Sequence, residues 1–434
     1  MRAAFFCVGD SLYLKDRFGA DPDELLMKAE NNMIMLALAD CPRTLEELCN
    51  ELNTRREDVE QGLEILLAAR LVKRVDDKYA TTIPVISNKK AASIARYLKG
   101  LVDRLARYLE ENVDRLEGAF MRTELSRNYS WEEVAHIVVD ALLMDFSFLN
   151  CVEEQLLEKG LYKDWTEDQL LIPYFGLELG VHQVNLGVNS YLLNGYGVSI
   201  MHATFIDRDP PLPEIIRTVS EGKKHICKLL EGTPPQKFPE GLLKMGLVKL
   251  QKGGVTLKVP VVNAKDREVI TETVLSLGYE LAEIFMSDYN VVRRSFDELG
   301  YSKWLKGIGD YAELIFHQVM GLTVLELMRR EILPPVPEKA PACWGTWLWQ
   351  APWTLDLRIM LSRGLGLLER LIMGNRGLEL LRKDIERARR LVEEGQYFKA
   401  SEVMKRLRRE VVKLLSLVSS SHSKSRLNIM RESG

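Results

Sequence analysis

The residue types best suited to specific recognition lie between Thr54 and Lys78. Two adjacent arginines and a glutamine stand at the start of a segment with helical spacing, and such side chains form paired hydrogen bonds with the edges of nucleic-acid bases. Three further cations follow in a strand-like segment and suit phosphate oxygens, which fix position without reading sequence. The candidate set is Thr54, Arg55, Arg56, Asp58 and Gln61, followed by Lys73, Arg74 and Lys78.

A second group with chemical potential is aromatic. Four of the seven tryptophans fall within ten residues of one another. The segment between them is short and is expected to be extended, so side chains alternate between its two faces. Such clusters bind flat or cationic ligands, or they fill a core or an interface. The sequence leaves both roles open for a ligand pocket lined by Trp344, Trp347, Trp349 and Trp353.

Catalytic and metal-binding patterns are missing from the sequence. The six cysteines are scattered without a CxxC pair, and the six histidines include no HExxH motif, which argues against a zinc site. The sequence contains no P-loop, no GxGxxG after a strand and no GxSxG, the motifs of several large enzyme classes. We therefore expect no catalytic residue, no metal site, no cofactor and a non-enzymatic role.

Three helices and a hairpin are expected between residues 31 and 86. The segment 45–52 has leucines at helical spacing, and Thr44 with Glu47 three residues later forms a capping box. Thr54 is expected to begin the next helix, whose apolar residues again recur with a period near 3.6. Two short strands around an Asp-Asp turn follow it.

This order of elements resembles the winged helix-turn-helix of the MarR and ArsR regulator families. The resemblance covers about 60 residues and is carried by Thr44–Leu45–Glu46–Glu47–Leu48, by Arg55–Arg56, and by the run Leu66 to Val72 with its Asp76–Asp77 wing. It implies that the third helix enters the major groove of duplex DNA. The charge opposes this role, because residues 31–88 carry seven Lys or Arg against ten Asp or Glu, and neutralising phosphates supplies much of DNA affinity.

An internal repeat is the second organising feature. Residues 66–86 align without gaps with residues 242–262, and seven of the 21 positions are identical. Self-similarity of this kind indicates a duplicated unit. Long helices are expected after both copies, at 89–116 and 266–288, and another at 131–159. Because prolines precede the second copy, any helix ahead of it is expected to be short and to begin near Pro239.

At 434 residues the chain is too long for one ordinary core, so several domains are expected. The predicted class is mainly α with small β wings, as tandem winged-helix and helical repeats plus a C-terminal helical region. The predicted segments are a winged helix-turn-helix at 1–88, a helical domain with a pocket at 89–206, a degenerate second winged-helix and helical repeat at 207–353, and a basic helical C-terminus with a disordered tail at 354–434. The last segment has 18 Lys or Arg against 10 Asp or Glu.

A cytoplasmic protein without membrane contact is expected. The N-terminal segment has no apolar signal-peptide core, and scattered cysteines suit a reducing compartment. Residues 181–206 contain no charged side chain but several asparagines and glycines, which are costly in a bilayer. We expect this stretch to be buried or pocket-forming.

These patterns favour a DNA-binding transcription regulator whose helical parts sense a small-molecule effector or mediate assembly. Its expected partners are double-stranded DNA, an effector and a second copy of the chain, since winged-helix regulators often bind two-fold sites as homodimers. The main alternative is a winged-helix scaffold that binds proteins and does not read DNA. A further alternative is an enzyme of unrecognised type.

Overall fold

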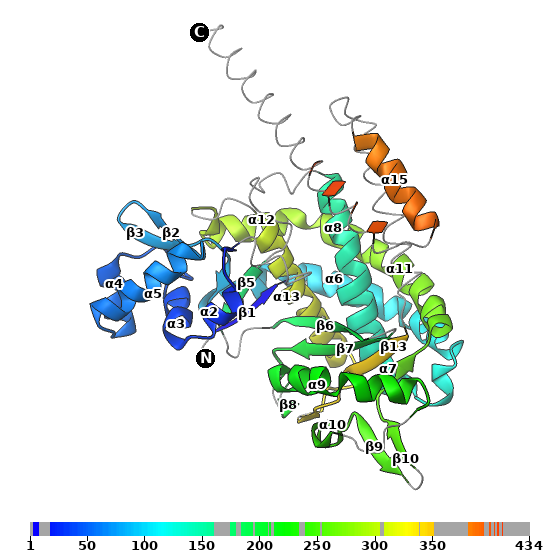
Figure 1. Cartoon of the computed structure of the whole chain (residues 1–434). Coiled ribbons are helices and arrows are strands. Elements are labelled where there is room, and N and C mark those ends of the chain that lie inside the picture. The colour runs from blue at the N-terminus through cyan, green and yellow to red at the C-terminus, as the bar shows by residue number, and fades with distance from the viewer. Residues whose placement is uncertain are drawn as a thin grey trace, which may run out of the picture.

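The computed structural model describes residues 3–7, 18–159, 174–178, 184–193, 196–206, 208–209, 212–233, 239–251, 254–303, 308–337, 339–350 and 381–394, with residues 399–400, 403, 406–407 and 410. Helices predominate over small sheets, which confirms the expected mainly α-helical class (Figure 1). A helical body occupies the centre, and two smaller units project from it on different sides.

The first unit consists of short helices followed by a hairpin. Its elements are α2 (Pro22–Leu26), α3 (Ala29–Ala37), α4 (Leu45–Leu52), α5 (Arg56–Ala68), β2 (Val72–Val75), β3 (Lys78–Thr81) and β4 (Val85–Ile86). The expected capping box begins α4: the Glu47 N–H donates to the Thr44 hydroxyl at 3.2 Å, and the Glu47 carboxylate accepts from the Thr44 N–H at 2.7 Å. The start expected for α5 is wrong by one residue. The Thr54 hydroxyl donates to the Leu52 carbonyl instead, so Arg55 becomes the N-cap.

The second unit is smaller and ends in a similar hairpin. Its elements are α9 (Leu212–Leu230), α10 (Glu240–Lys244), β9 (Val248–Gln251), β10 (Gly254–Leu257) and β11 (Val261–Val262). The short helix expected near Pro239 is confirmed, because Pro239 is the N-cap of α10. Proline suits this position since it lacks the N–H that a helix start leaves unsatisfied.

The two hairpins have matching backbone geometry. The Leu247 N–H donates to the Leu242 carbonyl and the Leu247 carbonyl accepts from the Lys258 N–H, and the aligned residue Leu71 makes both bonds at the same spacing. Strands β9, β10 and β11 each begin 176 residues after β2, β3 and β4. The helix after each hairpin also begins at this spacing.

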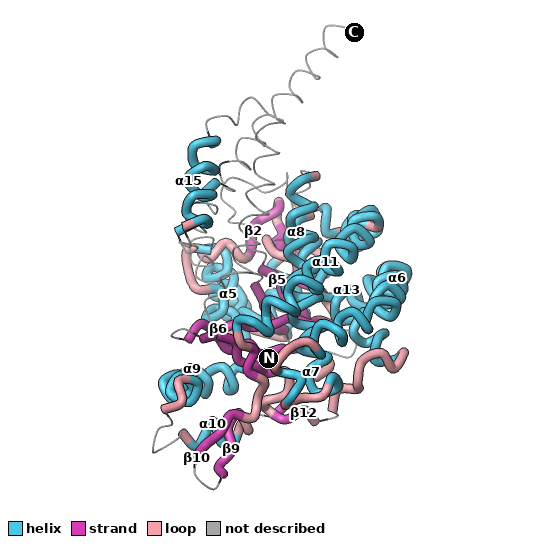
Figure 2. Tube along the Cα trace, turned by 90° about the vertical axis from the view of Figure 1, so that its right-hand side faces the viewer, coloured by secondary structure: helices cyan, strands magenta, loops and turns pink. Residues whose placement is uncertain are grey.

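The helical body supplies most of the buried apolar side chains. Its elements are α6 (Asn88–Met121), η2 (Leu125–Arg127), α7 (Trp131–His136), η3 (Ile137–Phe148), α8 (Leu149–Glu158), α11 (Ala264–Ser287), α12 (Tyr289–Glu298), η4 (Tyr301–Lys303) and α13 (Gly309–Arg329). They confirm the helices expected at 89–116, 131–159 and 266–288. Figure 2 shows α6, α11 and α13 packed side by side. Where α11 crosses η3, Gly278 permits the close approach, because a Cβ there would overlap Ser147.

Two sheets join the units to the body. In the smaller one, β5 (Tyr174–Glu178) lies between β1 (Ala3–Cys7) and β4. The larger one has the order β11-β13-β7-β6, with β13 (Thr346–Gln350) parallel to β11 and antiparallel to β7 (Tyr196–Ala203), and β6 (Leu186–Leu193) at the edge. A short parallel pair joins β8 (Arg208–Asp209) and β12 (Ala340–Pro341). The uncharged stretch 181–206 thus supplies a strand hairpin to a sheet, and Val198, Ile200 and Met201 within it are fully buried.

The predicted segments 89–206 and 207–353 share the larger sheet, since β6 and β7 come from one and β11 and β13 from the other. Of the C-terminal segment, the structure describes α15 (Arg382–Glu393) and a few residues beyond it. The tail expected to be disordered lies outside the described residues.

One described stretch, Trp131–Val152, has the length and apolar composition of a membrane span. Of its most apolar window, 78% is buried inside the protein. A core helix of a folded protein has this property too, so the stretch by itself is weak evidence for a membrane.

Candidate functional site

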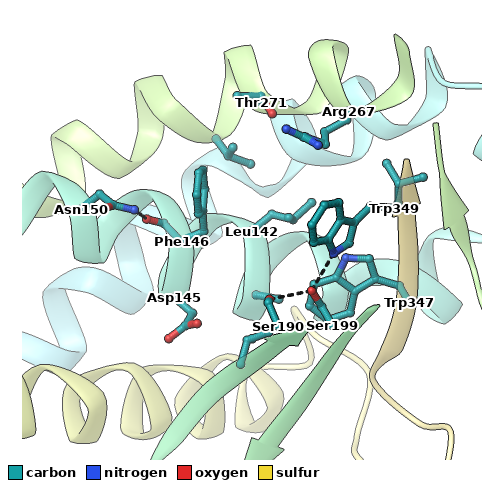
Figure 3. Close-up of a pocket in the computed structure, with 14 residues that line it drawn as sticks. Leu142, Asp145, Phe146, Asn150, Ser190, Ser199, Arg267, Thr271, Trp347 and Trp349 are labelled. Atoms are coloured by element: carbon teal, nitrogen blue, oxygen red, sulfur yellow. Dashed lines mark hydrogen bonds between the residues drawn. The ribbon is translucent and has the colours of Figure 1, made fainter. Parts of the chain in front are cut away.

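A cavity of about 110 Å³ lies between the larger sheet and three helices of the body (Figure 3). Helices η3, α8 and α11 form one wall, and strands β6, β7, β11 and β13 form the other. The lining combines apolar side chains with a few polar and charged ones: Ala141, Leu142, Asp145, Phe146, Asn150, Val188, Ser190, Ser199, Val262, Arg267, Thr271, Val274, Trp347 and Trp349. An apolar pocket with a small number of convergent polar groups is the usual form of a ligand site.

The helix geometry explains which side chains reach the cavity. Helix η3 is a π-helix, so its hydrogen bonds span five residues and its side chains recur at wider spacing than in an α-helix. Ala141 and Asp145 of η3 and Asn150 of α8 all face the cavity. On α11 the spacing is that of an α-helix, and Arg267 and Thr271 lie one turn apart. Long π-helical stretches are rare and are often found at functional sites.

The aromatic wall is held in place by hydrogen bonds. The Trp349 indole N–H donates to the Ser199 hydroxyl at 2.9 Å, and the Ser199 and Ser190 hydroxyls lie 2.8 Å apart. Gly197 on the neighbouring strand leaves room for the indole, because a Cβ at that position would overlap the ring. The orientation of Trp349 is therefore fixed by this network and by the missing side chain.

Arg267 brings a permanent positive charge to the cavity. It stands on the first turn of α11, is 7% exposed, and has its guanidinium carbon 5.9 Å from the centroid of the Trp349 ring. Stacking of a guanidinium on an indole is favourable and orients the group. Arginine stays charged at any physiological pH, so the cavity presents a buried cation next to an aromatic face.

Asp145 is the acidic group of the cavity. Burial raises its pKa to about 7, and a hydrogen bond from the Val188 N–H offsets part of that effect. His317 on α13 lies close to it, with Nε2 3.9 Å from the Asp145 carboxylate. Near neutral pH the carboxyl is therefore close to half protonated, and the charge of the cavity changes with pH.

The structure brings only part of the predicted tryptophan group to this cavity. Trp347 and Trp349 share one face of β13 and line it, as alternation predicted. Trp344 packs instead against His136, with ring centroids 5.2 Å apart. Trp353 lies outside the described residues.

No family model, curated protein or solved structure matches this chain. Among the described residues, no group of three or more His, Cys, Asp or Glu is placed to hold a metal ion.

The residues predicted to read DNA lie at the start of α5. Arg55 and Arg56 have side chains that are 80% and 64% exposed, and each forms an ion pair within the helix, with Asp58 and Glu60 respectively, at 2.9 Å. Exposed pairs of this kind contribute little to stability, so both arginines are able to exchange partners. Gln61 is exposed, and Thr54 and Asp58 are partly buried.

The face that α5 turns to solvent is acidic. Val59, Leu63 and Leu66 are buried on its inner side, and helical spacing puts Glu57 and Glu64 on the opposite side, where both are exposed. An acidic outer face repels phosphates. The arginines at the N-terminal end of α5 are its only described cations.

The three hairpin cations are placed differently from one another. Arg74 on β2 is exposed, donates to the Tyr79 hydroxyl at 3.1 Å and lies over the Tyr79 ring at 5.4 Å. Lys73 and Lys78 are partly buried on β2 and β3.

Sequence reasoning missed the two charged residues of the cavity. A signal for Asp145 was present, because it is one of two acids in the otherwise apolar stretch IVVDALLMDFSF, and a buried acid is rare without a structural or functional reason. Arg267 carried no comparable signal, since Lys265 and Glu268 surround it in an ordinary charged helix start.

Proposed function

We propose that this chain is a DNA-binding transcription regulator in which two winged-helix units are attached to a helical body that binds a small-molecule effector. The order of α3, α4, α5, β2 and β3 carries the proposal, because it is the order of a winged helix-turn-helix. An isolated β-bridge between Arg43 and Tyr79 adds the short third strand that accompanies such a hairpin. In this proposal α5 is the recognition helix, and the cavity is the effector site.

We further infer that the second unit is a degenerate copy of the first. The constant spacing of 176 residues for three strands and the following helix supports duplication. The matching backbone bonds at Leu71 and Leu247 support it too. In the second copy α10 has five residues, which is too short for a recognition helix that reads several bases.

The charge of the second unit suits contact with phosphates. Residues 212–262 contain nine Lys or Arg against four Asp or Glu, the reverse of the balance in residues 31–88. Lys224, Lys228, Lys249 and Lys258 are exposed on α9 and the hairpin. We propose that base contacts come from Arg55 in the first unit and its neighbours, and that the second unit adds phosphate contacts, which raise affinity without adding specificity. A cytoplasmic homodimer remains part of the proposal.

The test begins with selection of bound fragments from fragmented genomic DNA, followed by titration of a selected duplex at 50 and 200 mM salt. We expect affinity to fall steeply with salt, as it does when phosphates are neutralised. Arg55→Ala/Arg56→Ala should lose about 1–3 kcal/mol for each base contact and bind the selected and scrambled duplexes alike. The matched control is Arg122→Ala/Arg127→Ala, which removes two exposed arginines from the helical body and should leave discrimination unchanged. Absence of duplex binding by the native protein at 50 mM salt would refute the proposal.

The acidic outer face of α5 favours a second candidate, a winged-helix scaffold that binds a basic protein surface. Glu57 and Glu64 are exposed on that face, and complementary charge speeds and orients association between proteins. Glu57→Gln/Glu64→Gln separates the two candidates. The change should strengthen duplex binding if α5 approaches DNA, and it should weaken capture of a protein partner if α5 approaches a basic surface.

A further inference from the structure

We propose that the cavity between η3, α11 and the larger sheet binds a small monocarboxylate with a branched or cyclic apolar body, whose carboxylate pairs with Arg267. The inference deepens the proposed function by naming the chemical class of the effector. Only the regulatory role of the ligand rests on the proposed function. The binding of the carboxylate itself does not require DNA.

The positive charge of Arg267 favours an anionic ligand. The guanidinium of Arg267 lies in the cavity lining and is 7% exposed. A buried cation gains from an anionic partner because the surrounding medium screens the attraction weakly. A guanidinium presents two parallel N–H groups that match the two oxygens of a carboxylate. Stacking over Trp349 holds the fork in one orientation.

A second donor stands next to the arginine. Thr271 is 4% exposed, lies one helical turn from Arg267 and lines the same cavity. Figure 3 shows both side chains on α11 at the same side of the cavity, with Asp145 across from them on η3. The anion site is therefore at the α11 wall, at a distance from Asp145, the carboxyl group among the described lining residues.

Volume and lining determine the rest of the ligand. A cavity of about 150 Å³ with apolar walls holds the six carbons of benzene, so a cavity of about 110 Å³ limits the apolar body to roughly four heavy atoms. Leu142, Phe146, Val188 and Val274 supply aliphatic and aromatic surface to contact such a body, together with Trp347. Nucleotides, sugars and polyanions are too large or too polar for this space.

Asp145 adds a pH dependence to the binding of an anion. Burial raises its pKa to about 7, so its negative charge opposes an anion at pH 8 and is largely absent at pH 6. The groups that face it are His317 from α13 and the Val188 N–H from β6. The His317→Gln variant tests whether this neighbour contributes to the pH dependence.

The first experiment compares isosteric probes on the full-length native protein by titration calorimetry. Isovalerate carries the carboxylate, isovaleramide has nearly the same shape without charge, and isopentylamine is cationic. We expect saturable 1:1 binding of isovalerate, at least roughly 10-fold tighter than that of isovaleramide, because hydrogen bonds to charged groups contribute more than neutral ones. Equal binding of the amide, tighter binding of the amine, or no saturable binding of isovalerate at millimolar concentration would each overturn the proposal.

The second experiment uses two substitutions on the same helix. Arg267→Met should lower isovalerate affinity at least roughly 10-fold and leave isovaleramide affinity within about twofold. Retained amide binding shows that the cavity still forms. Lys265→Met removes the same charge from an exposed position two residues away and should change neither affinity. An unchanged isovalerate affinity in a folded Arg267→Met protein would overturn the role of Arg267. If that variant does not fold, the probe series on the native protein decides the proposal.

The DNA-binding proposal and the carboxylate-site proposal can be refuted independently. Isovalerate binding by a protein that binds no duplex leaves the carboxylate site in place and removes the regulatory role. Duplex binding by a protein that binds no carboxylate overturns the site alone.

Discussion

Replacement of Asp145 by asparagine should stabilise the protein, and more so at pH 8 than at pH 5. The aspartate is buried in a largely apolar wall, where the charged form is disfavoured. Its pKa is raised in the folded protein, from the ordinary value of 3.8 to about 7. Between these values the unfolded chain is ionised and the folded protein retains the proton, so folding becomes less favourable as pH rises. Asparagine has nearly the same shape and cannot ionise.

The size of the effect follows from the difference in pKa. About three units at 1.36 kcal/mol each give a total of about 4 kcal/mol above pH 7. Somewhat less than half of this cost is already present at pH 5, which leaves roughly 2.5 kcal/mol between pH 5 and pH 8. The side chain is 16% exposed, and water at its open side reduces the value further. We therefore expect the Asp145→Asn stabilisation to grow by about 1–2 kcal/mol from pH 5 to pH 8.

Urea unfolding midpoints of native and Asp145→Asn protein, measured at several values of pH from 5 to 8, test this expectation. The His317→Gln variant is measured in parallel, because His317 lies 3.9 Å from the carboxylate. A difference between native and Asp145→Asn protein that stays constant with pH would refute the raised pKa. A difference that falls with rising pH would show that the aspartate is ionised and paired in the folded state.

Three further predictions concern stability and are read from unfolding midpoints. Thr44→Ala removes the capping box of α4 and should cost about 1 kcal/mol, whereas Thr44→Ser should cost little; equal losses would contradict the cap. Gly278→Ala should cost about 1–3 kcal/mol, because its Cβ overlaps Ser147, and adding Ser147→Gly should restore part of the loss; no recovery would contradict the contact. Tyr301→Phe removes a buried hydroxyl that donates to a β4 carbonyl at 2.9 Å and should cost about 1–2 kcal/mol, more than Tyr79→Phe, which removes a hydroxyl that accepts from the exposed Arg74.

Local patterns were the reliable part of the sequence. The capping box at Thr44 depends on residues three apart, and the alternation that puts Trp347 and Trp349 on one face depends on residues two apart. The short helix after Pro239 follows from the missing proline N–H. Each feature is set within one element, so tertiary packing had little opportunity to change it.

The cavity could not be predicted from local sequence patterns, because it depends on contacts between distant segments. Asp145 and Arg267 belong to helices more than a hundred residues apart, and they share a cavity only because α11 crosses η3 at Gly278. The expected start of α5 failed for a smaller reason, since Thr54 found a competing backbone partner.

The cavity and the second hairpin share one stretch of chain, which indicates how an effector would act. Val262 of β11 and Arg267 of α11 both line the cavity, and β10 ends five residues before Val262. An anion that attracts Arg267 therefore acts on the helix that begins where the hairpin ends. A ligand shifts an arrangement only by the difference in its affinity for the two states, and the coupling is reciprocal. Duplex DNA must then change carboxylate affinity by the same factor. The position aligned with Arg267 in the helix after the first hairpin is Ala91 of α6, which offers no charge to an anion, so we expect effector control to act through the second unit.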